Sequence, residues 1–255
     1  MSRLLLALPL LLPSLGYAQD SPEKLLPASA QLYFRWDGVQ AHKDLYAKTA
    51  LGKMLAGDTG KFLKSIYKEL QEGLGSLLTV QGLLEGQPPE KVQKLQDDVT
   101  RATRVIELFA DRGFLLSAEV RSVNPPAGQV TLIIPDADKD AEKLFGTIRL
   151  LATLASADIK QTKADGKIYQ HLEIEPINVG WWLEGKHAVV IVSTEKIEAA
   201  AKKMRAGNHA RLDSAPLYKR LKAFKDFPTA ARAFIDVASL ARAAASIDKE
   251  VGALI

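Results

Sequence analysis

Cysteine is absent from the 255 residues of the chain, and this absence excludes several kinds of site at once. No disulfide can form, no thiolate can bind a metal, and no cysteine can act as a nucleophile. We also expect no lipoprotein anchor, which needs a cysteine directly after a signal cleavage point. Stability must therefore come from a packed core, and an apolar fraction of 47% is enough to build one.

Long apolar runs and an excess of one charge are also missing. The apolar stretch Leu4–Leu15 is interrupted by Pro9 and Pro13, whereas a membrane-spanning helix needs about 20 apolar residues. No later stretch reaches that length without a charged residue, so we expect no transmembrane span. The formal net charge is only +4, with acids and bases interleaved, which indicates a mixed surface and argues against nucleic acid as a partner.

No signature of a known catalytic or cofactor site is present. The Gly-Lys-Ser/Thr, Gly-x-Ser-x-Gly and His-Glu-x-x-His motifs do not occur, and Gly73–Gly75 lacks the third glycine of a dinucleotide-binding loop. Asp136–Asp140 begins like a calcium-binding loop, but Ala141 stands where that loop needs glycine and Thr147 where it needs glutamate. The sequence therefore predicts no cofactor.

The first 18 residues have the pattern of an export signal. Arg3 supplies the positive charge, Leu4–Leu15 the apolar stretch, and Gly16–Ala18 the small-x-small cleavage site before Gln19. We therefore expect the mature protein, residues 19–255, to be periplasmic or secreted and to form one domain.

Periodicity predicts an α+β fold with a mostly antiparallel sheet and helices packed on it. A strand is expected at 32–37, followed by helices to about residue 109, one of which begins after Pro88–Pro89. Further helices are expected from Asp136, after Thr194, from Pro216 and from Leu240. A strand at 231–237 precedes the last of these.

Short turns predict hairpins in the middle of the chain. The loop 124–128 separates two strands, and tight turns are expected at Asp165–Gly166 and at Gly185–Lys186. Residues 159–193 should therefore form a continuous antiparallel meander.

One strand of this meander carries a candidate metal site. His171, Glu173 and Glu175 alternate, so their side chains leave one face and offer one nitrogen and two carboxylates to a metal. The alternative is the solvent face of an amphipathic strand, whose buried face would consist of Ile168, Leu172 and Ile174.

A candidate ligand-binding site involves three aromatic residues. Trp181 and Trp182 are adjacent and point to opposite faces, so one should be buried and the other exposed. An exposed tryptophan beside Tyr169 would stack on a sugar or on a partner.

The organisation is similar to that of a family of bacterial secreted proteins classed as a domain of unknown function. The segments that carry the resemblance are LLPASAQLYFRW (25–36), TALGKML (49–55) and a Val-Ser-Thr that follows the hairpins and precedes a helix. The resemblance spans most of residues 25–245. It implies export and an α+β fold, and it assigns no site residues.

The end of the chain loosely repeats its beginning. Residues 233–237 followed by Leu240 resemble residues 32–36 followed by Val39, which suggests the first unit of a duplicated arrangement or a strand that closes the sheet. A duplicated arrangement predicts self-association, with Leu254 and Ile255 against an exposed apolar patch.

These observations support three interpretations of function. The leading one is a non-enzymatic exported module that binds a partner protein or an envelope component. The second is an extracytoplasmic hydrolase, which would need a cleft that joins carboxylates to His42, His171, His187 or His209. The third is a structural repeat unit of a larger envelope protein.

Overall fold

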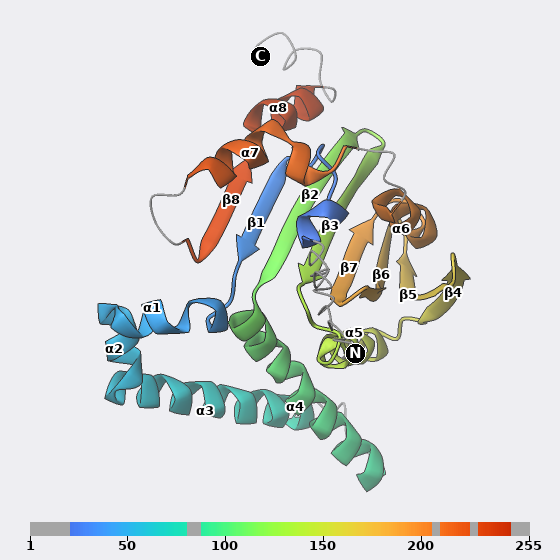
Figure 1. The fold of residues 1–255 in the computed structure, drawn as a ribbon. Coiled ribbons are helices and arrows are strands. Elements are labelled where there is room, and N and C mark those ends of the chain that lie inside the picture. Colours follow the sequence, from blue (N-terminus) through green and yellow to red (C-terminus); the bar gives the residue numbers. More distant parts are fainter. Residues whose placement is uncertain (1–20, 81–87, 206–209, 225–228, 246–255) are drawn as a thin grey trace, which may run out of the picture.

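The computed structural model describes residues 21–80, 88–205, 210–224 and 229–245 (Figure 1). Within them, eight strands form one antiparallel sheet in the order β4-β5-β6-β7-β3-β2-β1-β8. The strands are β1 (Leu32–Trp36), β2 (Phe114–Val123), β3 (Pro126–Ile134), β4 (Lys160–Ala164), β5 (Lys167–Ile174), β6 (Ile177–Glu184), β7 (His187–Ser193) and β8 (Ala231–Ile235). The predicted α+β class and antiparallel sheet are confirmed. The expected signal segment, His209, Leu254 and Ile255 lie outside the described residues.

Helices precede, interrupt and follow the strands. They are α1 (Lys43–Lys48), α2 (Ala50–Ala56), α3 (Asp58–Val80), α4 (Pro89–Arg112), α5 (Ala141–Leu154), α6 (Ile197–Arg205), α7 (Pro216–Ala223) and α8 (Val237–Ala245). Three short 3-10 helices are η1 (Pro22–Leu25), η2 (Gln40–His42) and η3 (Leu212–Ser214). Pro89 stands in the first turn of α4, where the ring costs no hydrogen bond, as the Pro88–Pro89 pair predicted.

The predicted meander is confirmed: β4, β5, β6 and β7 are neighbours in chain order. Asp165 and Gly166 connect β4 to β5 with φ angles of 50° and 75°. Positive φ at both central residues matches the twist of the flanking strands, which is why an Asp-Gly pair is so informative.

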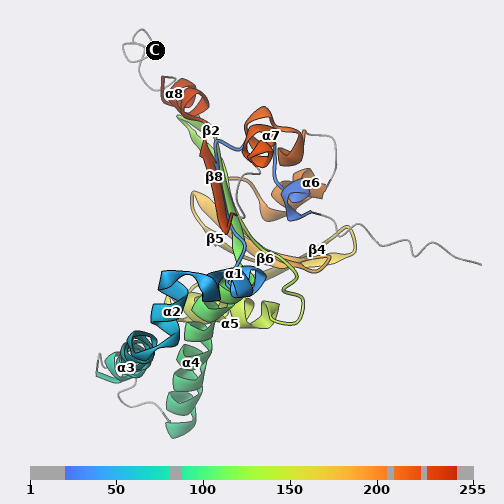
Figure 2. The same cartoon turned by 60° about the vertical axis from the view of Figure 1, so that its left-hand side comes forward.

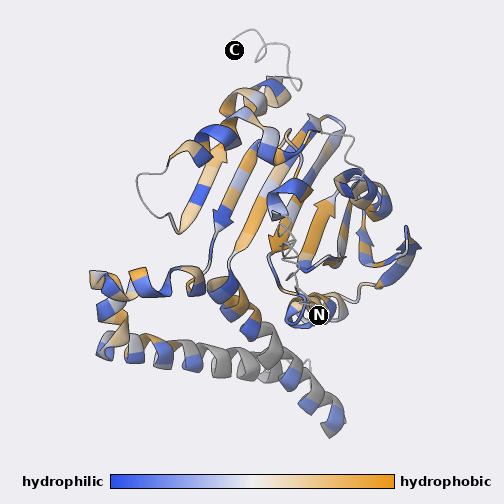
Figure 3. Ribbon diagram, in the orientation of Figure 1, coloured by the Kyte–Doolittle hydropathy of each residue, from blue (hydrophilic) through white to orange (hydrophobic). Residues whose placement is uncertain are grey.

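Helices α6 and α7 cover one face of the sheet together with η1 and η3 (Figure 2). The core beneath them includes Tyr33, Leu115 and Ile191 from the strands and Ile197 from α6. Apolar residues are concentrated along these strands, whereas the helices also carry hydrophilic positions (Figure 3). Gly180 allows the close contact with α6, because an added Cβ would lie 2.5 Å from the Ile197 side chain.

The opposite face is covered over part of its width. Helix α5 and the end of α4 pack there against Ile134, Trp181 and Ala188, with Val105 and Leu144 contributed by the two helices. This second core lies over β3, β7, β6 and β5. No helix of the described residues contributes buried side chains to a comparable core over β1 and β8.

Helices α1 to α4 form an arm that projects from one end of the sheet (Figures 1 and 2). The arm is joined to the sheet where Gly38, after β1, meets Gly113, between α4 and β2. A Cβ on Gly38 would lie 2.4 Å from the Asp111 carbonyl oxygen, and its φ of 83° also favours glycine. Among the described residues, none of the helices combines the length and apolar character that crossing a bilayer requires.

Strand β8 pairs with β1 in antiparallel register, with Tyr33 opposite Phe234. The last strand therefore extends the sheet beside the first one, which is the second of the two alternatives that the sequence left open. Helix α8 follows directly and contacts β2.

Candidate functional site

The predicted metal-binding strand departs from the expectation at three of its residues. His171 is only 5% exposed on the face covered by α6, whereas Ile168 and Ile174 are exposed at the two ends of β5. Glu173 and Glu175 are exposed, as predicted. Leu172 is buried against the second core, as predicted. The prediction was wrong for His171, Ile168 and Ile174 because both faces of β5 are covered at its centre and neither is covered at its ends, so alternation alone does not separate core from solvent.

His171 and Glu173 do come together, but Glu175 does not join them. His171 Nε2 lies 3.5 Å from Glu173 Oε1, and Glu173 also forms an ion pair with Lys160. The hydrogen bond from Lys160 lowers the pKa of Glu173. In the part of the chain that the structure describes, no three His, Asp or Glu side chains converge on a possible metal position.

These residues line a hollow of about 460 Å³ between β4, β5 and the start of α6. Asn178 lies in it and donates a hydrogen bond of 3.1 Å to the Glu195 carbonyl. Lys160 and Lys196 bring positive charge to the rim. The hollow is polar and holds two acids, of which Glu173 forms an ion pair with Lys160 and Glu198 lies at the start of α6.

Both tryptophans are buried, so the expectation that one would be exposed was wrong. Trp181 lies in the second core and donates to Gln170 Oε1 at 2.9 Å, while Trp182 lies on the α6 face and donates to Glu184 Oε2 at 3.1 Å. Tyr169 is fully buried and meets Trp182 edge to face, with 5.2 Å between ring centroids. The three aromatic residues therefore form part of the core and offer no stacking surface.

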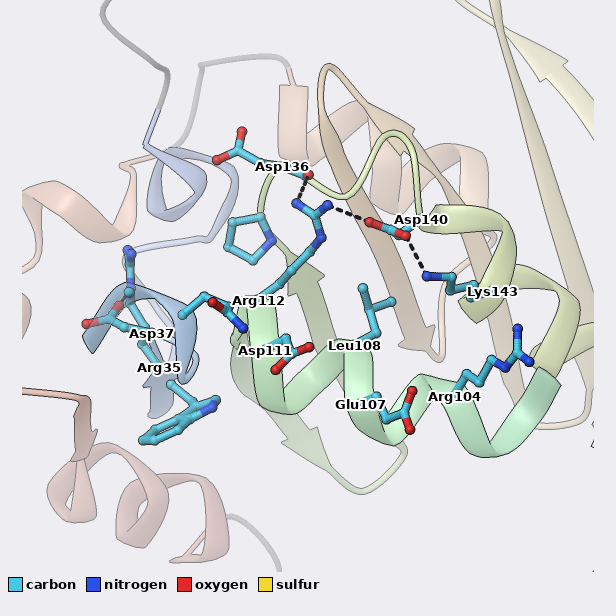
Figure 4. A pocket seen from close by; sticks show the side chains of 14 residues that line it. Arg35, Asp37, Arg104, Glu107, Leu108, Asp111, Arg112, Asp136, Asp140 and Lys143 are labelled. Atoms are coloured by element: carbon cyan, nitrogen blue, oxygen red, sulfur yellow. Dashed lines mark hydrogen bonds and ion pairs between the residues drawn. The ribbon is translucent and has the colours of Figure 1, made fainter. Parts of the chain in front are cut away.

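A polar cleft of about 610 Å³ lies where α4, η2 and the connection from β3 to α5 meet (Figure 4). Arg112 reaches across it and donates to the Asp136 carbonyl at 2.8 Å and to Asp140 Oδ2 at 2.5 Å. Lys143 donates to the other oxygen of Asp140 at 2.7 Å. The hydrogen bond from Lys143, together with the charge of Arg112, lowers the pKa of Asp140.

Helix α4 lines the same cleft with Arg104, Glu107 and Asp111, which lie along one side of the helix (Figure 4). This wall carries charges of both signs, one base and two acids. The cleft therefore has the chemistry of a solvated surface with internal ion pairs, and it shows no preference for an anion or a cation.

A buried ionic network adjoins the cleft behind β1. Glu23, which is 1% exposed, accepts hydrogen bonds from Tyr33 at 3.0 Å and from Arg35 at 2.5 Å. Asp37 continues the network through an ion pair with Arg35 and a hydrogen bond of 3.1 Å from Arg232. Burial opposes ionisation of Glu23, but hydrogen bonds from Ser21 and the charge of Arg35 outweigh it and lower its pKa to about 2.

The structure describes the side chains of His42, His171 and His187, three of the four histidines that the hydrolase interpretation names. His42 Nε2 lies 3.6 Å from Asp37 Oδ2, which is itself engaged by two arginines. His187 Nδ1 accepts a hydrogen bond of 3.2 Å from the Asp136 N–H. His171 approaches Glu173, as described above.

An apolar surface that α4 and α5 leave uncovered lies on β1, β2, β3 and β8, and we call it the open face. Of the described helices, α8 contacts β2. The open face is built by alternate residues whose neighbours point into the first core. They are Leu32 and Phe34 on β1, Leu116 and Ala118 on β2, Val130 and Leu132 on β3, and Ala231, Ala233 and Ile235 on β8. Val130 is 41% exposed and Ile235 is 58% exposed. The arm adds exposed apolar side chains such as Leu51 and Phe62.

Sequence reasoning missed the open face. Leu32, Phe34 and Trp36 alternate on one side of the strand, which makes that side apolar, but the pattern does not say whether a helix covers it. In the structure Tyr33 is buried on the side of the first core, whereas Leu32 and Phe34 on the other side are partly exposed.

The chain was compared with models of protein families, with curated proteins and with solved structures, and none of the three comparisons found a match.

Proposed function

We propose that the chain is an exported, non-enzymatic binding module that holds a partner protein against the open face of its sheet. One observation carries the proposal: helices α4 and α5 cover one half of this side of the sheet, whereas the other half presents apolar side chains, Val130 and Ile235 among them, to solvent. Exposed apolar patches on folded proteins mark interaction sites.

A protein is the class of partner that this surface fits. Leucine, phenylalanine and valine side chains spread over four neighbouring strands give a broad apolar contact with few hydrogen-bonding groups. The centre of a protein interface has the same character, rich in apolar and aromatic side chains and poor in charge. Small-molecule sites are instead concave and enclose most of their ligand.

Export is part of the proposal and is supported by residues 1–18, which combine a basic start, an apolar stretch and a small-x-small end. Mass spectrometry of the protein from culture supernatant or periplasm should give a mature chain that begins at Gln19. Retention of residues 1–18 in the exported protein would contradict this part.

Photo-crosslinking in the producing cells tests the binding role. A photoreactive amino acid at position 130 should form an adduct with a second protein, whereas the same amino acid at position 151 should not. Leu151 is a matched control because it is 59% exposed but lies on the outer side of α5. Equal adducts at both positions, or none at position 130, would count against the open face.

An activity assay distinguishes a hydrolase from a binding module. Purified protein that cleaves ester, peptide or glycoside substrates, and loses this activity on His42→Ala or His171→Ala, would replace the binding proposal. We expect no such histidine-dependent turnover.

A further inference from the structure

Among the residues that the structure describes, strand β8 forms one edge of the sheet, and its bonds to β1 show which of its backbone groups have no partner there. The Asp236 N–H donates to the Gln31 carbonyl at 2.7 Å, and the Asp37 N–H donates to the Ala230 carbonyl at 2.9 Å. The even-numbered residues at both ends of β8 therefore face β1. In an antiparallel pair the backbone groups of successive residues alternate in direction, so those of Ala231, Ala233 and Ile235 point away from the sheet.

The two edges of the sheet are protected differently. The opposite edge, β4, carries exposed lysines at 160 and 163, and edge lysines are a common obstacle to pairing with another strand. Strand β8 has the same length of five residues, but its only charged residue is Arg232. The guanidinium of Arg232 is turned toward the α7 side of the sheet, where it binds Asp37. The outward groups of β8 are therefore flanked only by alanine and isoleucine.

We infer that β8 pairs with β8 of a second copy of the chain, antiparallel about a twofold axis at Ala233. Ala233 then lies opposite its own counterpart, and Ala231 lies opposite Ile235. Each of these pairs exchanges two N–H···O bonds, because all three residues direct their backbone groups outward. With the twofold axis at Ala233, all the backbone N–H and C=O groups of β8 that point outward are hydrogen-bonded to the second copy.

The side chains of β8 are self-complementary in this register. On the α7 side, Arg232 of each copy lies opposite Phe234 of the other, and no two like charges face each other. Phe234 already stacks on Tyr33 with 5.6 Å between centroids, so its ring is held in place beside the edge. On the other side, alanine and isoleucine meet, and the two open faces become one continuous surface.

This pairing deepens the proposed function, because it doubles the surface offered to a partner protein. It has a geometric basis of its own, however, in the edge of the sheet and not in its face. The two proposals can therefore fail separately.

Disulfide trapping tests the register, and the absence of native cysteine makes single-cysteine variants unambiguous. Ala233→Cys should form a disulfide-linked dimer on mild oxidation, because Cα atoms of a hydrogen-bonded antiparallel pair lie about 5.5 Å apart, within the range of a disulfide. Ala231→Cys alone should not, since its counterpart is four positions away, about 14 Å. The same holds for Ile235→Cys alone, but a mixture of these two variants should give the linked heterodimer.

Two results of this experiment would overturn the pairing. One is a folded Ala233→Cys variant that remains monomeric under oxidation. The other is linkage of Ala231→Cys or Ile235→Cys alone at the rate of their mixture, which would indicate random collision. Thr162→Cys on β4 provides the background rate.

A proline variant tests the pairing without an added thiol. Ala233→Pro removes an outward N–H and leaves the bonds to β1 intact, a position at which edge strands tolerate proline. Circular dichroism should be unchanged, while self-association measured by sedimentation weakens at least about tenfold relative to Ala233→Ser, which keeps the N–H. Equal association of both variants, or a monomeric parent protein at all concentrations, would contradict the inference.

The outcomes also separate this inference from the proposed function. Val130→Lys, on β3 and away from the edge, should keep the Ala233→Cys disulfide while the amount of partner protein that copurifies with it falls. If the disulfide fails to form but the adduct from position 130 persists, only the pairing of β8 is wrong. A disulfide between Ala233→Cys and a different protein would likewise contradict the inference that β8 pairs with a second copy of the chain.

Discussion

The Tyr33 hydroxyl donates a hydrogen bond of 3.0 Å to Glu23 Oε1, and both side chains are buried. The bond connects η1, which precedes the sheet in the chain, to β1, the strand next to the edge strand β8. Burial and the negative charge of Glu23 raise the pKa of Tyr33, so the hydroxyl keeps its proton and remains a donor.

Glu23 should make the protein sensitive to acid. Its pKa is about 2 in the folded chain, below the ordinary value of 4.5, so its stabilising effect is complete above pH 4.5 and is lost as the pH falls toward 2. A shift of this size corresponds to about 3 kcal/mol. Urea unfolding of Glu23→Gln should show a lower free energy of unfolding at pH 7, by about 3 kcal/mol, and less change between pH 4.5 and 2.

The control for this prediction is Glu198→Gln, a carboxylate in the first turn of α6 outside the buried network. It should retain the acid sensitivity of the parent protein. If Glu23→Gln has the same pH profile as the parent protein, Glu23 is not the group that titrates.

Gly180 should be intolerant of even a methyl group. Gly180→Ala would place a Cβ 2.5 Å from the Ile197 side chain and force α6 away from the sheet, at a cost of about 1–3 kcal/mol. Gly146→Ala is the matched control, because the Cβ would meet only the end of Arg149, at 3.9 Å, in the middle of α5. Thermal unfolding should show a lower midpoint for the first variant and an equal or higher one for the second. Equal midpoints would show that α6 is not packed closely on β6.

Zinc and manganese should leave the melting temperature of the protein unchanged. His171 and Glu173 approach each other, but Glu175 does not join them and Lys160 already neutralises Glu173. Differential scanning fluorimetry with each metal tests this expectation. A rise in melting temperature that disappears in His171→Ala would establish the metal site that the sequence suggested.

Local signals predicted the parts of the fold that depend on neighbouring residues. Asp165–Gly166 fixed a tight turn between β4 and β5, and Pro88–Pro89 fixed the beginning of α4. Both are determined by backbone dihedral preferences within a few residues. The pairing of β8 with β1 joins residues about 200 positions apart, and no local pattern specifies it.

The exposure expected for His171 and for one of the two tryptophans was wrong for a related reason. Alternation along β5 suggested one solvent face, but α6 covers His171 and α5 lies on the opposite side of the sheet. Trp181 and Trp182 are both buried because β6 lies in the interior of the sheet, where helices cover both faces. Which face of a strand is covered depends on helices distant in sequence, so periodicity alone could not locate the open face.

The central claim is that the open face binds a partner protein. The most direct test is to measure how much partner protein copurifies when a residue of the open face is substituted. Val130→Lys places a charge on this surface, where burial against a partner would leave the charge unpaired, whereas Leu151→Lys places the same charge on the outer side of α5. If the open face binds the partner, the amount of partner protein that copurifies with Val130→Lys should be at least about tenfold lower than with the parent protein. The amount that copurifies with Leu151→Lys should equal that of the parent protein. Unchanged copurification with a folded Val130→Lys variant, or an equal loss with Leu151→Lys, would contradict the account.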